Sequence, residues 1–191
     1  MAGAAALAVL LAISGCAALS DVAASSVRAR GAFVPAQEKF EASGRVSLRH
    51  GAQALTANFR WLHQGERDEI DLASPLGQTL ARLSGAPGAV SLRLADGSAT
   101  SAPDWATLMS RSLEWALPIE GLGYWIQGVP RPGAAFEVEW GADGAPALLR
   151  QDGWTVVYQP FVRDPSGRMR PARLALSYPD TEVRVAVDAW L

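Results

Sequence analysis

Apolar and polar residues alternate along most of the chain, and this pattern restricts the possible folds more than any other feature. In residues 55–61, Leu55, Ala57, Phe59 and Trp61 occupy every second position, with polar residues between them. Successive side chains of a β-strand point to opposite faces, so the segment is predicted to be a strand with one apolar face. The same alternation recurs at residues 90–94, 136–140, 154–158, 174–178 and 183–187.

Short turn sequences separate these predicted strands. Each consists of a polar residue followed by glycine: His50-Gly51, Gln64-Gly65, Asp96-Gly97, Asp143-Gly144, Asp152-Gly153 and Ser166-Gly167. Strands joined this tightly pair in an antiparallel manner. An antiparallel sheet with one apolar face needs another element to cover that face.

The central segment is predicted to supply the cover. A helical pattern opens after Pro103 and is closed by Pro118, and its apolar face holds Trp105, Leu108 and Met109. A second short helix is expected over residues 120–127, carrying Leu122, Trp125 and Ile126. We therefore expect a mainly β domain with some α-structure, in which a helical hairpin lies between the two halves of one curved antiparallel sheet.

The N-terminus predicts export. Residues 1–15 form an apolar stretch shorter than the roughly 20 residues that span a bilayer, which is typical of a signal peptide. The segment Ile13-Ser14-Gly15-Cys16 resembles the lipobox of bacterial lipoproteins, in which the cysteine carries lipid. Cys16 is the only cysteine, and lipid would protect its thiol in an oxidising compartment. The predicted organisation is a signal peptide (1–15), a lipidated N-terminus and tether (16–38), and a single domain (39–191).

Composition and motifs argue against several functional classes. The net charge of −2 gives no basic surface for nucleic acid. No Gly-x-Ser-x-Gly sequence occurs, and His50 and His63 stand at or beside turns without neighbours at metal-ligand spacing. The only lysine, Lys39, lies outside any phosphate-binding loop. We therefore expect no enzyme, no metal and no cofactor.

Several segments together resemble the LolB family of outer-membrane lipoprotein receptors. They follow one another in the family's order and span nearly all of the chain after Cys16: Gly44-Arg45, Phe59-Arg60-Trp61, Ser74-Pro75-Leu76-Gly77, Leu117-Pro118-Ile119, the run from Tyr124 to Pro130, the run from Gly153 to Tyr158, and Asp188-Ala189-Trp190. The resemblance implies an unclosed β-barrel with a helical lid over a hydrophobic cavity, the architecture of the periplasmic carrier LolA.

The function that this resemblance implies is the last step of lipoprotein localisation. A family member accepts a triacylated lipoprotein from LolA and releases it into the phospholipid of the inner leaflet of the outer membrane. It is itself anchored there by lipid, facing the periplasm, and is expected to be a monomer. The resemblance also gives Ala17 a meaning, because in many Gram-negative bacteria an Asp directly after the lipidated cysteine retains a lipoprotein in the inner membrane, and its absence favours the outer membrane.

Two sets of residues are candidates for this function. The acyl-chain cavity is expected to be lined by apolar residues of the strands and helices: Leu55, Phe59, Trp61, Leu92, Leu94, Trp105, Leu108, Met109, Trp125, Ile126, Val138, Trp140 and Val156. The pattern alone does not separate a cavity wall from a closed core. The turn Pro75-Leu76-Gly77 places a leucine at a bend, where the resemblance implies a protruding tip that delivers lipid into the membrane. A leucine folded back onto the sheet is the alternative.

Two other functions fit an anchored β-domain of this kind. One is a lipoprotein chaperone like the soluble carrier, and the other is a non-catalytic envelope assembly lipoprotein that binds a protein partner. An envelope lipase would need a nucleophile and a base, which the motifs do not supply. The presence of bound lipid would distinguish the receptor from the assembly protein.

Overall fold

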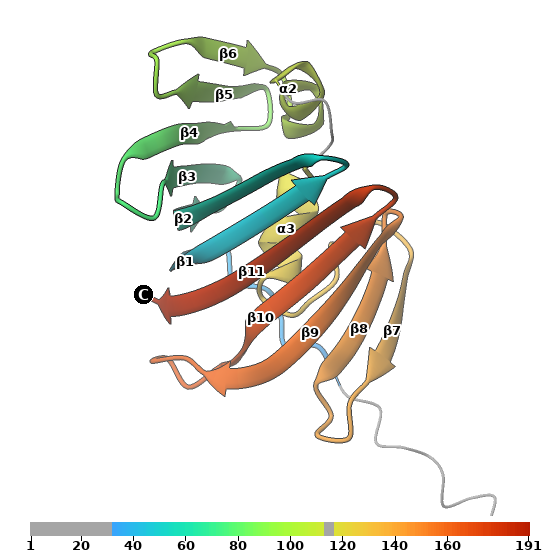
Figure 1. Ribbon diagram of the computed structural model, residues 1–191. Coiled ribbons are helices and arrows are strands. Elements are labelled where there is room, and N and C mark those ends of the chain that lie inside the picture. The colour runs from blue at the N-terminus through green and yellow to red at the C-terminus, as the bar shows by residue number, and fades with distance from the viewer. Residues whose placement is uncertain (1–31, 113–116) are drawn as a thin grey trace, which may run out of the picture. The chain divides into compact units, whose positions relative to one another are not determined.

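The computed structural model describes residues 32–112 and 117–191, and Cys16 lies outside these ranges. In them, a single 11-stranded antiparallel sheet has the strand order β6-β5-β4-β3-β2-β1-β11-β10-β9-β8-β7 (Figure 1). The strands are β1 (Lys39–His50), β2 (Gln53–Gln64), β3 (Arg67–Ala73), β4 (Thr79–Ala86), β5 (Ala89–Leu94), β6 (Ala99–Ala102), β7 (Phe136–Trp140), β8 (Pro146–Gln151), β9 (Trp154–Arg163), β10 (Met169–Tyr178) and β11 (Thr181–Trp190). The helices are α2 (Trp105–Ser112) and α3 (Ile119–Trp125).

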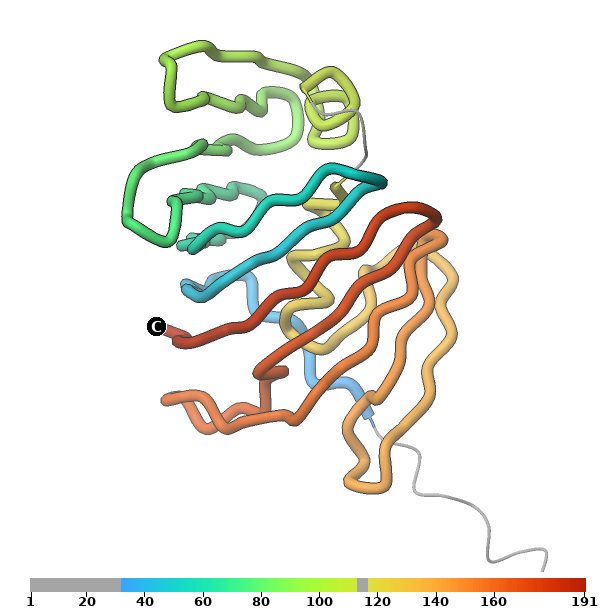
Figure 2. The backbone as a smooth tube through the Cα atoms, in the orientation of Figure 1, coloured from blue at the N-terminus to red at the C-terminus, as the bar shows by residue number. Residues whose placement is uncertain are grey.

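The first and last strands meet in the middle of the sheet. β1 pairs with both β2 and β11, so the chain runs outward to the edge at β6 and returns from the opposite edge at β7. The segment with α2 and α3 connects these two edges, which do not pair with each other. Figure 2 shows the strands curving around α3, which lies on one face of the sheet. The expected unclosed, curved sheet with a helical insertion is thus confirmed.

Local sequence explains where the turns and helices form. Gly65 and Gly97 have φ values of 63° and 87°, which glycine adopts without a steric penalty, so they stand at hairpin turns as predicted. The Asp104 carboxylate accepts a 2.7 Å hydrogen bond from the Thr107 amide and caps α2. This bond lowers the pKa of Asp104 below its usual value. α3 begins directly after Pro118.

The apolar face of the sheet is the concave one, and it is covered unequally. Phe59 and Trp61 on β2 are buried as the alternation predicts. Trp140 on the edge strand β7 is only half-buried. Phe33 packs against it, with the two ring centres 4.8 Å apart. Phe33, which belongs to the predicted tether of residues 16–38, thus contacts the domain.

A buried arginine connects four separate parts of the chain. Arg170 on β10 is 3% exposed, and its guanidinium donates to Asp164 at 3.2 Å, to Gln127 at 3.0 Å, and to Gln37. It also lies 4.8 Å from the centre of the Trp190 ring. These contacts tie the residues before β1, the end of α3, the β9–β10 turn and the end of β11 together. The position of α3 is therefore fixed partly by polar contacts.

We expect Arg170→Met to reduce the free energy of unfolding by about 3–5 kcal/mol, because the buried Asp164 carboxylate would lose its cation. Urea unfolding would measure this loss. The matched control is Arg184→Met, since Arg184 is 68% exposed and its pair with Glu182 is worth at most about 1 kcal/mol. Equal losses in the two variants would contradict the assignment.

The ion pair of Arg170 and Asp164 also predicts that the free energy of unfolding depends on pH in the acid range. Burial would raise the pKa of Asp164, but hydrogen bonds from Ser166, the Arg168 amide and Arg170 outweigh this effect and lower it to about 2. The unfolded-state pKa is about 3.9. Because the folded pKa is the lower one, the stabilisation is complete above about pH 5 and is lost progressively as pH falls through 4 toward 2. Unfolding curves of Arg170→Met should show less of this loss.

Candidate functional site

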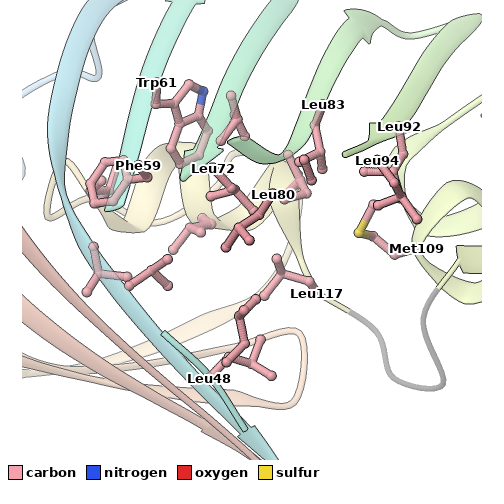
Figure 3. Close-up of a pocket in the computed structure, with 18 residues that line it drawn as sticks. Leu48, Phe59, Trp61, Leu72, Leu80, Leu83, Leu92, Leu94, Met109 and Leu117 are labelled. Atoms are coloured by element: carbon pink, nitrogen blue, oxygen red, sulfur yellow. The ribbon is translucent and has the colours of Figure 1, made fainter. Parts of the chain in front are cut away.

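An apolar cavity lies between the concave face of β1–β5 and the two helices (Figure 3). Its volume is about 280 Å³. Every residue that lines it is apolar: Val46, Leu48, Leu55, Phe59, Trp61, Ile70, Leu72, Leu80, Ala81, Leu83, Leu92, Leu94, Met109, Leu117, Ile119, Leu122, Ile126 and Val185. Apolar contacts of this kind are not directional, so such a site binds apolar surface in general and does not select a particular functional group.

The cavity is open at the rim. Leu55 on β2 and Leu94 on β5 line it, yet they are 39% and 44% exposed. The cavity therefore contacts solvent at this rim, where a bound apolar ligand would bury the exposed leucines.

The size of the cavity limits what it holds in this conformation. A cavity of about 150 Å³ takes up one benzene molecule, with its six carbon atoms. By that measure, 280 Å³ accommodates an apolar chain of roughly ten carbon atoms. The site therefore fits part of one long acyl chain.

Seven of the thirteen predicted cavity residues line this cavity, and six lie elsewhere. The seven are Leu55, Phe59, Trp61, Leu92, Leu94, Met109 and Ile126. Trp105 and Leu108 are buried on α2, Trp125 on α3 and Val156 on β9. Val138 and Trp140 are half-buried on β7.

The path of α3 explains this division. Trp125 packs against Trp154 with ring centres 6.4 Å apart, and its indole NH donates to Gln151 at 2.9 Å. α3 thereby closes on the strands that come from the C-terminal half of the chain and leaves space on the β1–β5 side. Val156 belongs to the closed half, so its inward position makes it a core residue and not a cavity residue.

Several lining residues were not predicted from the sequence. The short alternations Ile70–Leu72 and Ala81–Leu83 were available signals for two of the strands, β3 and β4. Leu80 gave no such signal, because it is adjacent to Ala81 and ordinary alternation would place it on the outer face. Leu117 on the approach to α3 is also part of the wall.

The loop between β3 and β4 presents its leucine to solvent. The Gly77 amide donates to the Ser74 carbonyl at 2.8 Å, and the Ser74 amide donates to the Gln78 carbonyl at 2.7 Å. Gly77 has φ 85°, so Pro75, Leu76 and Gly77 form a three-residue hairpin loop. Leu76 is 90% exposed and is not folded back onto the sheet. The role predicted for it stays a prediction.

The histidines have structural partners. His63 Nδ1 lies 2.7 Å from an oxygen of Asp68, which also accepts a 2.7 Å bond from the Trp61 indole NH. His50 Nδ1 lies 2.8 Å from the Thr181 hydroxyl. Within the two described ranges, no three His, Cys, Asp or Glu side chains are grouped closely enough to hold a metal ion. In the same ranges, no helix has the length and hydropathy needed to cross a membrane.

Comparison with known proteins places these features in a family context. The family model described as outer membrane lipoprotein LolB matches residues 38–190. A protein from Thiobacillus denitrificans named outer-membrane lipoprotein LolB is 35% identical over 94% of this chain and 91% of its own length. Proteins of the same name from Azoarcus and Chromobacterium violaceum are 35% and 37% identical, over 96% and 81% of this chain and 94% and 82% of their own lengths.

Solved structures show the same fold at low sequence identity. A LolA superfamily protein from Nitrosomonas europaea has a TM-score of 0.52 at 9% identity, covering 81% of this chain and 86% of its own. A putative outer membrane lipoprotein-sorting protein domain from Vibrio parahaemolyticus has a TM-score of 0.50 at 10% identity, covering 80% and 84%. At these identities the likeness concerns the fold alone.

Proposed function

This chain belongs to the outer-membrane lipoprotein LolB family, and on this premise we propose that it is the receptor that completes lipoprotein localisation. It accepts triacylated lipoproteins from a periplasmic LolA-like carrier and inserts them into the inner leaflet of the outer membrane. The observation that carries the proposal is the cavity whose 18 lining residues are all apolar.

The physical need for such a cavity follows from the acyl chains. Each methylene moved from apolar surroundings into water costs about 0.8 kcal/mol, so three exposed chains would cost tens of kcal/mol. Cargo proteins differ in sequence and share only these chains, which suits a wall of Leu, Ile, Val and Phe without fixed polar contacts. The present volume of about 280 Å³ is smaller than three chains require, so we expect the cavity to widen on loading.

We attribute the direction of transfer to differences in the affinity for acyl chains. The two steps run forward if this protein binds acyl chains more tightly than the carrier and the membrane binds them more tightly still. No covalent step is then needed. A nucleotide is not needed either, which agrees with the position of Lys39 outside a phosphate-binding loop.

The membrane anchor is assigned to Cys16. Lipid on this cysteine would hold the domain at the outer membrane, facing the periplasm, and residues between Cys16 and Phe33 would form the tether. Mass spectrometry of the mature N-terminus should find an acylated Cys16. An unmodified cysteine there would instead favour a soluble, carrier-like chaperone.

The protruding loop is assigned to the delivery step. Leu76 is the most exposed large apolar side chain of the described domain, at 90%, and a leucine in that position gains free energy by entering lipid. The short hairpin holds it away from the sheet. We therefore assign Leu76 to contact with the bilayer.

A two-stage assay tests the whole proposal. A LolA-like carrier loaded with a triacylated lipoprotein is mixed with this protein, and vesicles of phosphatidylethanolamine and phosphatidylglycerol are added afterwards. The cargo should move first to this protein and then into the vesicles. The control omits this protein. Cargo that remains on the carrier in both mixtures would rule out the receptor and leave the envelope assembly role.

A further inference from the structure

Three partly exposed leucines of the cavity wall stand at the end of the sheet that carries the protruding loop. Leu72 ends the apolar side of β3, Leu80 lies near the start of β4, and Leu94 ends β5. All three line the cavity, and Figure 3 shows Leu72 beside Leu80, with Leu94 farther along the wall next to Leu92 and Met109. We propose that Leu72, Leu80 and Leu94 form a leucine track along which an acyl chain moves from the cavity to Leu76. This inference rests on the proposed receptor function.

A β-bulge places Leu80 on the track. Leu72 of β3 pairs with Ala81 of β4, whereas the next residue, Ala73, pairs with Thr79, so Leu80 has no partner on β3. In a bulge, two residues of one strand stand opposite one residue of the other, and the extra side chain is redirected. Leu80 and its neighbour Ala81 consequently both line the cavity, which ordinary alternation does not allow.

Leu94 continues the track on the next strand. It pairs with Ala81, and the amide of the following residue, Ala95, donates a 3.1 Å hydrogen bond to the Leu80 carbonyl. These bonds hold the ends of β4 and β5 together beside the loop. Leu94 nevertheless remains 44% exposed. An apolar side chain that is half in the cavity and half in solvent suits a passing ligand better than a static core.

The distances suit one continuous movement. Leu76 is four residues from both Leu72 and Leu80, so its Cα lies within roughly 14 Å of each. A lipid acyl chain spans half of the 30 Å hydrocarbon core, roughly 15 Å. One end of a chain can therefore reach the bilayer at Leu76 while the other end is still in the cavity. A chain moving in this way exposes fewer methylenes to water than one that leaves the cavity first.

Transfer kinetics distinguish the two routes. A fluorescent long-chain fatty acid is bound to the purified full chain, and its transfer to phosphatidylethanolamine–phosphatidylglycerol vesicles is followed at increasing vesicle concentration. Transfer along the track requires contact with the vesicle, so its rate constant should rise with vesicle concentration. Transfer through water would give a rate constant that does not change.

The test variant is Leu80→Asn, and Leu94→Asn is the second in case the first does not fold. We expect contact-dependent transfer to fall about tenfold, the factor for losing the apolar contact of about two methylenes. Leu80→Met should restore it. The matched control is Val157→Asn, because Val157 is an apolar side chain with a similar exposed fraction, 41%, but lies on β9 and does not line the cavity.

The outcomes separate the track from the receptor function. The control variant should bind the fatty acid and transfer it to vesicles as the wild type does. Equal transfer rates for Leu80→Asn and Val157→Asn would overturn the track, as would a wild-type rate that does not depend on vesicle concentration. Failure of the proposed function would appear differently, as a wild-type protein that binds no fatty acid and accepts no lipoprotein.

Discussion

The variant Ala81→Phe is expected to lose acceptance of acyl chains while keeping its fold. Ala81 lies on β4 in the cavity wall, between Leu72 of β3 and Leu94 of β5. A benzene ring needs about 150 Å³, so the new side chain would fill about half of the 280 Å³. An acyl chain deprived of about five methylene positions would bind at least a hundredfold more weakly, at about 0.8 kcal/mol per methylene.

Titration with a fluorescent fatty acid and the first stage of the transfer assay would measure this loss. Thermal unfolding should be unchanged or shifted upward, because the ring fills space that is otherwise empty. The control is Ala89→Phe, at an exposed position on the neighbouring strand β5, which should bind as the wild type does. Wild-type affinity in Ala81→Phe would mean that acyl chains bind outside this cavity.

The sheet could be predicted from the sequence because its signals are local. Alternation and glycine turns depend on neighbouring residues, and they located the strand that carries Phe59 and Trp61 as well as the order of sheet and helices. The family motifs added the expectation of a cavity. Alternation could not predict which part of the sheet faces the cavity, because it places Val156 and Phe59 alike on the inner face of the sheet.

What separates those two residues is the route of α3, a long-range property. The helix closes on one half of the sheet through Trp125, Trp154 and Gln151, and that half becomes a packed core. The bulge at Leu80 is another departure that alternation does not reveal, since one extra residue in β4 reverses the expected side. Both departures shape the cavity, so the least predictable parts of the fold are the ones that bear on function.

The loop was predictable for a different reason. Proline and glycine in Pro75-Leu76-Gly77 favour a turn, but the sequence left open whether the leucine between them protrudes or folds back onto the sheet. The structure adds how firmly the loop is held. The Ser74 hydroxyl accepts a 3.2 Å bond from the Gln78 amide, in addition to the two backbone bonds across the hairpin. A loop held in this way keeps its tip exposed.

Leu76→Glu is expected to separate the two stages of transfer. Acceptance from the carrier should be unchanged, because Leu76 is 90% exposed and does not line the cavity. Delivery to vesicles should fall by up to about a hundredfold, since an acidic side chain costs roughly 2.5–3.5 kcal/mol deep in a bilayer and less near its surface. The free energy of unfolding should not change, because an exposed side chain contributes no core packing.

Two further substitutions at this position identify the cause. Leu76→Met keeps an apolar tip and should deliver cargo as the wild type does, whereas Leu76→Gln has the shape of Glu without its charge and should be intermediate. Delivery that decreases from Met to Gln to Glu at this position is expected only if the side chain enters lipid. Vesicle insertion at the wild-type rate in Leu76→Glu, with acceptance intact, would show that the loop does not contact the membrane. The exit of acyl chains would then have to be sought at another part of the cavity rim, where Leu55 is also exposed.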